Sequence, residues 1–248
     1  MEFNMKSITR FIATAITAVG LLTGAHAQQA PGAAKKLLTP ENSAIIMIDH
    51  QSQMAFAVQS IDRTLLTNNA VALAKTAKAF NVPTVLTTVA EKSFSGPIFG
   101  GIKQALPNSP VIDRTTMNSW EDKNFRDAVK KTGKKKLVMS ALWTEVCLVM
   151  PVMAALEEGY EVYIVTDASG GVTKEAHDMA VTRMVQAGAT PVTWMQVLLE
   201  YQRDWARQST YDATVKIALE HGGAYGTGLE YAKAMLGQDA GEGKAAKK

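Results

Sequence analysis

The chain has 248 residues and a formal net charge of +3, with 47% hydrophobic and 20% charged residues. This composition is typical of a globular protein with a substantial core, and it excludes a disordered or collagen-like chain. The small net charge gives no support for binding to nucleic acid or to an anionic membrane, and the single cysteine excludes an intramolecular disulfide.

Residues 1–27 have the pattern of a secretory signal peptide. The segment consists of a basic start, an almost uncharged apolar run and a small-residue cleavage site, at Lys6 and Arg10, residues 11–22 and Ala25-His26-Ala27. The apolar run is shorter than the ~20 residues that a membrane span needs, which favours a cleaved leader over an uncleaved anchor. We therefore predict a periplasmic or secreted protein, cleaved after about Ala27, whose mature form has no membrane segment.

Three further parts follow this leader. Residues 28–37 are rich in Ala, Gln and Lys, which favours a linker. Residues 38–236 are predicted to form one folded domain that ends in a helical arm. Residues 237–248 are rich in Gly, Ala and Lys, and this composition predicts a disordered tail.

Within residues 38–236, short apolar runs alternate with segments of helical periodicity, as in a parallel sheet covered by helices. The runs are rich in Val and Ile and are apolar on both faces, as buried parallel strands are. They lie at residues 44–49, 84–88, 136–141, 161–166 and 190–193, with 111–112 as one more candidate. Together they predict an α/β fold, a three-layer doubly wound sandwich with a mostly parallel, about six-stranded sheet.

Apolar residues at helical spacing predict the helices between and after these runs. They lie at about residues 70–80, 125–129, 146–158, 173–187, 196–207 and 211–221. The segment at 205–235 mixes aromatic and aliphatic residues and has two interpretations. It is either an arm that packs on a neighbouring subunit or a cap on its own sheet.

Polar residues that follow buried strands are the candidates for chemistry, because open α/β sheets bind ligands beyond the carboxyl ends of their strands. Asp49 closes the first run, and Cys147 follows the run at 136–141, in the first turn of the next helix. Backbone N–H groups and the positive end of the helix dipole favour a thiolate there. Pro151 has no N–H for the Cys147 carbonyl, which predicts a distorted start of this helix, either at a tuned site or as an ordinary kink.

The chain also carries four motifs in a characteristic order. They are Ile48-Asp49-His50-Gln51, Arg114 with Asn118-Ser119-Trp120, Thr144-Glu145-Val146-Cys147 and Val165-Thr166-Asp167-Ala168-Ser169. Over about residues 38–210, this set resembles the isochorismatase-like cysteine hydrolases, and most of all their YcaC-like branch. The resemblance implies a six-stranded parallel sheet, an Asp–Lys–Cys triad, a non-proline cis peptide bond and homo-oligomers. Carried onto this chain, it makes Cys147 the nucleophile, Asp49 the acid/base and Trp143–Thr144 the cis bond.

One position departs from the family pattern. Where the resemblance implies a lysine in the triad, this chain has Arg114. Arginine stays protonated in proteins, so it supplies a fixed charge and a bidentate hydrogen-bonding group but no proton. With Arg114 as the third member, Asp49 carries the proton transfers alone. Lys92 and Lys123 are alternatives, but neither stands at the matching position.

In the predicted mechanism, Asp49 takes the proton of Cys147, and the thiolate attacks a carbonyl or nitrile carbon beside Arg114. The backbone N–H groups of Val146 and Cys147 are the predicted oxyanion hole. The predicted substrate pocket is lined by Gln51, Phe56, Asn118, Trp120 and Trp143. Each of these aromatic side chains is, on its own, equally typical of a core or an interface.

The histidines outside the leader are scattered, and no Asp-x-His-x-x-His cluster follows Asp49, so we predict no metal and no cofactor. We expect His50 and Asp167 to make structural hydrogen bonds. The lysines at positions 130–136 fall at a predicted helix C-terminus, where cations complement the dipole. They therefore indicate a solvated helix end, and we expect no nucleic-acid partner.

These observations favour an exported, metal-free cysteine hydrolase that cleaves a small amide-type C–N bond of a small-molecule substrate through a thioester on Cys147. One alternative is isochorismatase-type vinyl ether hydrolysis, in which a carboxylic acid protonates the substrate and no nucleophilic cysteine is needed. The other is a non-catalytic oligomeric binding or scaffold protein that keeps the fold, and Arg114 is its best support. A lone cysteine is often only a small buried hydrophobic residue.

Overall fold

The computed structural model describes residues 34–237. The predicted signal peptide at 1–27 and the predicted tail at 237–248, apart from Gly237, lie outside the described residues. The same holds for residues 28–33 of the predicted linker. None of the helices that the structure describes has the length and the apolar character of a membrane span.

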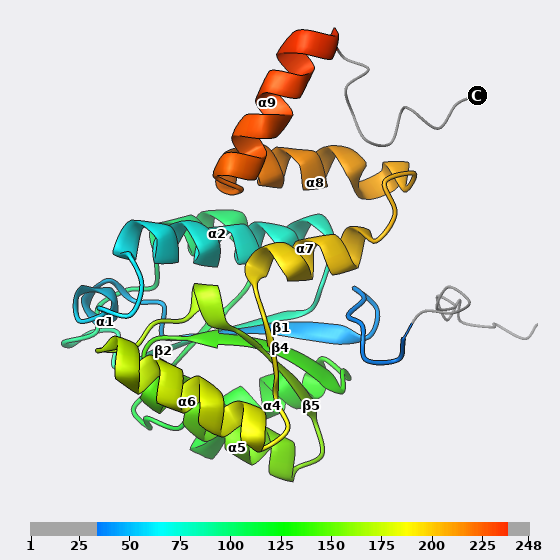
Figure 1. Cartoon of the computed structure of the whole chain (residues 1–248). Helices are drawn as coiled ribbons and strands as arrows, with labels where there is room; N and C mark the ends of the chain where they lie inside the picture. The colour runs from blue at the N-terminus through cyan, green and yellow to red at the C-terminus, as the bar shows by residue number, and fades with distance from the viewer. Residues whose placement is uncertain (1–33, 238–248) are drawn as a thin grey trace, which may run out of the picture. The chain divides into compact units, whose positions relative to one another are not determined.

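One sheet of six strands forms the centre of the domain (Figure 1). In chain order the strands are β1 (Ser43–Ile48), β2 (Thr84–Val89), β3 (Val111–Arg114), β4 (Lys136–Ala141), β5 (Glu161–Val165) and β6 (Thr190–Val192). They lie in the order β3-β2-β1-β4-β5-β6, and each neighbouring pair is parallel. This confirms the doubly wound fold. The order reverses between β1 and β4, so the carboxyl ends of these two strands flank the switch point at which such sheets bind ligands.

Helices cover both faces of the sheet, which confirms the three-layer prediction (Figure 1). One face carries α2 (Arg63–Ala79), α3 (Gly100–Ala105) and α7 (Trp194–Gln202). The other carries α4 (Lys123–Lys131), α5 (Val149–Glu157) and α6 (Lys174–Gln186). The short helix α1 (Ser52–Phe56), which the sequence did not predict, follows β1.

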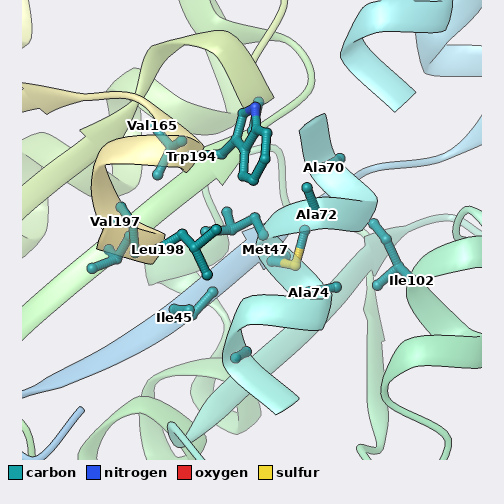
Figure 2. Packing of buried hydrophobic residues seen from close by; sticks show 14 of the residues in the cluster. Ile45, Met47, Ala70, Ala72, Ala74, Ile102, Val165, Trp194, Val197 and Leu198 are labelled. Atoms are coloured by element: carbon teal, nitrogen blue, oxygen red, sulfur yellow. The ribbon is translucent and has the colours of Figure 1, made fainter. Parts of the chain in front are cut away.

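The alternation of side chains along β1 divides the core into two parts. Ile45 and Met47 pack with the cluster under α2 and α7, whereas Ile46 and Ile48 pack with the cluster on α4, α5 and α6. Figure 2 shows Ile45 and Met47 among residues of α2 and beside Leu198 of α7. Because helices cover both faces, every residue of β1 is buried, and the strand is a nearly continuous apolar run.

The C-terminal arm consists of α8 (Gln208–His221) and α9 (Ala224–Leu236). α8 packs against α2 and α7, and α9 packs on α8 (Figure 1). The α9 side chains Tyr231, Met235 and Leu236 remain exposed. Within this chain, α8 therefore covers helices α2 and α7 of its own domain, not the sheet that the second interpretation named, while α9 presents an apolar surface, as the first would require.

Several predicted helices have different bounds in the structure. The helix predicted at 70–80 is α2, which begins earlier, at Arg63. The helix predicted at 196–207 is α7, which ends at Gln202 because Arg203 adopts a left-handed conformation with φ of 53°. The helix predicted at 146–158 is divided into the π-helical turn η2 (Thr144–Leu148) and α5. Pro151 lies in the first turn of α5, directly after this π-helical turn. The predicted distortion is thus observed, and it coincides with the turn that carries Cys147.

Candidate active site

Asp49 lies at the switch point, directly after β1. Its backbone adopts a left-handed conformation, with φ of 56°, which is uncommon for residues other than glycine but is tolerated best by Asp and Asn. The Asp49 N–H still donates to the Thr87 carbonyl of β2 at 3.0 Å, so the residue continues the sheet on one side. The turn then leaves the carboxyl group fully buried just beyond the carboxyl end of β1.

Arg114 is the last residue of β3, and its side chain reaches the Asp49 carboxylate. Arg114 Nη2 lies 2.7 Å from Asp49 Oδ2, and both side chains are completely buried. Arg114 Nη1 donates to the Thr116 carbonyl, which fixes the second arm of the guanidinium. Because an arginine keeps its charge even when buried, this pair gives the site a permanent cation.

Cys147 lies in turn η2 with 3% of its surface exposed, close enough to Asp49 for the carboxylate to raise the pKa of the thiol. Asp49 Oδ1 makes no hydrogen bond among the described residues. The structure thus brings the three predicted catalytic residues together: Arg114 holds one carboxylate oxygen of Asp49, and the thiol lies beside the carboxylate.

Burial and charge set the protonation of this group. Burial raises the pKa of Cys147, and the neighbouring Asp49 charge raises it further, while Arg114 and the Trp143 N–H lower it less. Burial also raises the pKa of Asp49, although the Arg114 charge opposes this. The expectation that the helix start favours a thiolate was therefore wrong for the free protein. The loss of solvation and the adjacent carboxylate outweigh the backbone dipoles, so the thiol is neutral at rest.

The backbone donors near the sulfur differ from those predicted. The N–H groups of Val146 and Cys147, the predicted oxyanion hole, both donate to the Trp143 carbonyl, at 3.1 and 2.9 Å. The Leu148 N–H points at the same carbonyl at 3.3 Å, because the wide π-helical turn directs successive N–H groups at one acceptor. The backbone N–H that lowers the pKa of the Cys147 thiol is that of Trp143, which the sequence did not single out.

The cis peptide bond is also placed differently. The resemblance put it at Trp143–Thr144, whereas the structure has it at Leu142–Trp143. Leu142 still follows the sheet, since its N–H donates to the Ile48 carbonyl at 3.1 Å, and the Thr144 N–H donates to the Gly170 carbonyl at 2.9 Å. The chain therefore changes direction between these two fixed points, one residue earlier than predicted.

Two of the five predicted pocket residues lie close to the catalytic segments. Gln51 is fully buried, and its amide bonds the backbone of Val89 and Gly96, so it fixes the loop after β2. Trp143 is half-buried, and its indole N–H donates to the Met54 carbonyl at 2.8 Å. Each side chain therefore holds a loop at the carboxyl edge of the sheet.

The other three predicted pocket residues have the following positions in the structure. Trp120 is a core residue that contacts Phe125 and donates to Glu158 Oε1 at 2.8 Å, so the core alternative holds for it. Asn118 caps the short 3₁₀ turn η1 (Ser119–Glu121) by accepting from the Trp120 N–H. Phe56 is 71% exposed at the end of α1. The sequence could not separate these roles, because each depends on how loops pack.

The structural hydrogen bonds predicted for His50 and Asp167 are confirmed. His50 is fully buried and bonds the Ala168 carbonyl at 2.9 Å, and burial lowers its pKa to about 4. Asp167 accepts the Trp194 N–H at 2.9 Å, which ties its loop to α7. Lys123 pairs with Asp127 on the surface, far more exposed than Arg114, and is not the third member of the group. Within residues 34–237, no three His, Cys, Asp or Glu side chains converge as they would around a metal ion.

A further set of contacts around turn η2 was missed. Thr144 Oγ1 lies 2.8 Å from His177 Nδ1 of α6, and Glu145 Oε1 accepts the Val172 N–H at 2.9 Å. Gly171 lies between them, where an added Cβ would come within 2.6 Å of Glu145 Oε2. The adjacent glycines at 170–171 were the available sequence signal, since a backbone that passes this close requires a residue without a side chain.

Comparison with known proteins gives a consistent match. Residues 43–196 match the isochorismatase domain family. The probable hydrolase YcaC of Escherichia coli is 40% identical over 169 residues, which are 68% of this chain and 81% of that protein.

Solved structures agree with this match. The YcaC structure from Pseudomonas aeruginosa, described with hexane-2,5-diol and covalent acrylamide, is 36% identical with a TM-score of 0.76, and the match covers 80% of this chain and 98% of that one. The YcaC structure from E. coli, described as an octameric hydrolase of unknown specificity, is 36% identical with a TM-score of 0.77, over 82% and 99%. Nicotinamidase from Bacillus subtilis, at 14% identity and a TM-score of 0.55, shares the fold.

Proposed function

Because the chain belongs to the isochorismatase family, in its YcaC-like branch, we propose that this family hydrolase acts on small amide-type C–N bonds through a thioester on Cys147. The observation that carries the proposal is the buried group at the switch point. In it the Arg114 guanidinium lies 2.7 Å from Asp49, and the Cys147 thiol lies beside the same carboxyl, whose charge raises the pKa of the thiol.

The first half of the proposed reaction forms the thioester. Asp49 takes the thiol proton as the sulfur attacks the carbonyl carbon, so a C–S bond forms and the C=O electron pair moves to oxygen. When the oxyanion collapses, the C–N bond breaks, and the proton on Asp49 passes to the leaving nitrogen. The raised pKa of Asp49 suits this role, because the carboxyl must hold the proton for part of the cycle.

The second half releases the acid. Asp49 takes a proton from water, the hydroxyl adds to the thioester carbonyl, and the C–S bond breaks. The sulfur then regains the proton from Asp49. Arg114 exchanges no proton in these steps, because its charge is fixed. It stabilises the negative charge whether that charge is on Asp49 or on the sulfur.

The relatives supply further support for a reactive nucleophile. The P. aeruginosa protein is described with covalent acrylamide, and acrylamide is an electrophile that thiolates attack. In this chain the sulfur is 3% exposed. The proposal therefore requires the surrounding loops to open for the substrate.

Vinyl ether hydrolysis is the second candidate, and one observation favours it. The pKa of Asp49 is raised, and a carboxylic acid is the group that would protonate a vinyl ether. In this reaction Cys147 would have no covalent role, so its substitution separates the two candidates.

We also propose that the protein is a homo-oligomer exported from the cytoplasm. The E. coli relative is described as octameric. In this chain, α9 carries three apolar side chains at 66–82% exposure, Tyr231, Met235 and Leu236, which suit a subunit contact. The proposal of export rests on the signal-peptide pattern of residues 1–27.

Ammonia release from a panel of small amides tests the proposed chemistry. We expect turnover by the intact protein, an acyl adduct on Cys147 in mass spectra of the quenched reaction, and the loss of both in Cys147→Ala. Asp49→Asn should lose turnover but keep a cysteine that iodoacetamide labels. Pyruvate release from isochorismate that persists in Cys147→Ala would establish the second candidate. If neither ammonia nor pyruvate is released and iodoacetamide does not label the thiol, the result would indicate a scaffold protein.

A further inference from the structure

Turn η2 is connected to the segments around it by side chains that the proposed reaction does not use. Thr144 opens this turn, three residues before Cys147. Its N–H donates to the Gly170 carbonyl at 2.9 Å, and its Oγ1 lies 2.8 Å from His177 Nδ1. Thr144 is fully buried, so solvent cannot replace the imidazole as the hydrogen-bond partner of this hydroxyl.

We infer that Thr144 and His177, together called the brace, are positioning residues that hold the Cys147 sulfur against Asp49. The inference rests on the proposed function, because it assigns a role in setting the nucleophile. The Cys147 N–H donates to the carbonyl of Trp143, the residue next to Thr144, at 2.9 Å. A change at Thr144 therefore moves the residue to which the Cys147 backbone is hydrogen-bonded.

The surroundings of His177 favour a neutral ring that serves this role. Burial lowers the pKa of His177, with Asp178 and Lys174 of its own helix acting in opposite directions. From η2, Glu145 faces the ring, and Gly171 of the neighbouring loop leaves room for both side chains. Glu145 Oε1 in turn accepts the Val172 N–H, so the same turn is fastened to the loop as well as to α6.

The brace predicts a specific change in the thiol. In the intact protein, burial and Asp49 hold the pKa of Cys147 above its ordinary value. When Thr144→Val or His177→Ala removes the hydrogen bond, the turn loosens, the sulfur leaves Asp49, and the pKa falls toward the free-thiol value of about 8.5. The thiol then reacts faster with iodoacetamide, while amide turnover decreases.

The test measures the rate of Cys147 alkylation from pH 6 to pH 10 by mass spectrometry. We expect the rate of the intact protein to rise throughout this range. In Thr144→Val and His177→Ala the rate should be at least about tenfold higher at pH 7.5 and should level off near pH 9, since each unit of pKa changes the thiolate fraction about tenfold. Thr144→Ser keeps the hydroxyl and should restore the intact profile.

Thr214→Val is the matched control. Thr214 is equally buried, and its hydroxyl donates to Gln202 Oε1 at 3.0 Å in the C-terminal arm. It loses the same chemical group without touching turn η2, so its alkylation profile should remain that of the intact protein. If a brace variant does not fold, His177→Gln takes its place in the test. The Gln side chain still forms hydrogen bonds, but its length differs from that of His.

Profiles of Thr144→Val and His177→Ala that match Thr214→Val would overturn the inference. Failure of the proposed function gives a different result. The intact protein would then release no ammonia from any amide, yet the alkylation profiles would still separate the brace variants from the control.

Discussion

Replacement of Arg114 by Met tests whether the buried ion pair governs both stability and protonation at the site. The substitution keeps most of the side-chain length but removes the guanidinium from Asp49, whose carboxylate lies 2.7 Å away with neither side chain exposed. Removal of one partner from a buried pair leaves the other charge without compensation, which costs about 3–5 kcal/mol. For a domain of this size, we expect the melting temperature to fall by about 6–20 °C.

The pKa of Asp49 determines how this loss of stability changes with pH. Asp49 has a raised pKa in the fold, so above its unfolded value of 3.8 the folded state binds more protons than the unfolded state, and stability falls as the pH rises through that window. Without Arg114 the pKa of Asp49 rises further. The destabilisation by Arg114→Met should therefore be larger at pH 8 than at pH 4.5.

Urea unfolding at a fixed protein concentration measures this, because the stability of the proposed homo-oligomer would depend on concentration. Asp49→Asn in the Arg114→Met background should recover part of the loss, since a neutral amide needs no cation. Lys123→Met is the control, because it removes the cation of an exposed pair with Asp127 and should leave the unfolding midpoint unchanged. An Arg114→Met protein within about 1 kcal/mol of the parent at both pH values would refute the reasoning.

Three further predictions follow from individual contacts. His50 is buried with its pKa lowered to about 4, so the folded state binds fewer protons than the unfolded state below pH 6.5. About 3 kcal/mol of stability should be lost as the pH falls from 6.5 to 4, and His50→Asn should flatten this part of the urea-derived profile; an unchanged slope would contradict the assignment. Gly171→Ala places a Cβ 2.6 Å from Glu145 Oε2 and should destabilise the fold by about 1–3 kcal/mol in thermal melts. Gly100→Ala, which meets no atom within 4 Å, should be nearly neutral, and equal effects would argue against a close approach at Gly171. Met235→Glu combined with Leu236→Glu should reduce the mass of the assembly in light scattering, and an unchanged mass would exclude this end of α9 from the subunit contact.

The sequence predicted the fold well because its strongest signals are set by burial on both faces. β1 and β4 are continuous apolar runs, and their predicted bounds agree with the structure within one residue. α1 and α3 were missed because each has five or six residues, too few for a helical periodicity to show. The end of α7 was placed too late, since the left-handed conformation of Arg203 has no glycine or asparagine to announce it.

At the site, residue identities were predictable and their local geometry was not. Asp49 and Cys147 could be singled out because both follow neighbouring central strands, and that relation depends on topology alone. The hydrogen bonds of the Val146 and Cys147 N–H groups depend on turn η2 being π-helical, which no spacing in the sequence reveals. The thiol pKa depends on the balance between burial and the backbone dipoles, and only the packed structure sets the burial.

The arginine at position 114, where the resemblance implies a lysine, has a physical consequence for the proposed proton transfer. With Cys147 neutral, Asp49 ionised and Arg114 charged, the buried group has no net charge, and after the proton moves from sulfur to carboxyl it still has none. The transfer therefore relocates one negative charge beside a fixed cation and avoids bringing a new charge into the interior, which would be far more costly. A lysine buried at this depth could lose its proton and with it that balance, whereas an arginine cannot. On this reasoning, Arg114→Lys should retain turnover at low pH and lose it as the pH rises. A pH–rate profile that is the same in this variant as in the intact protein would show that the site does not require a fixed charge.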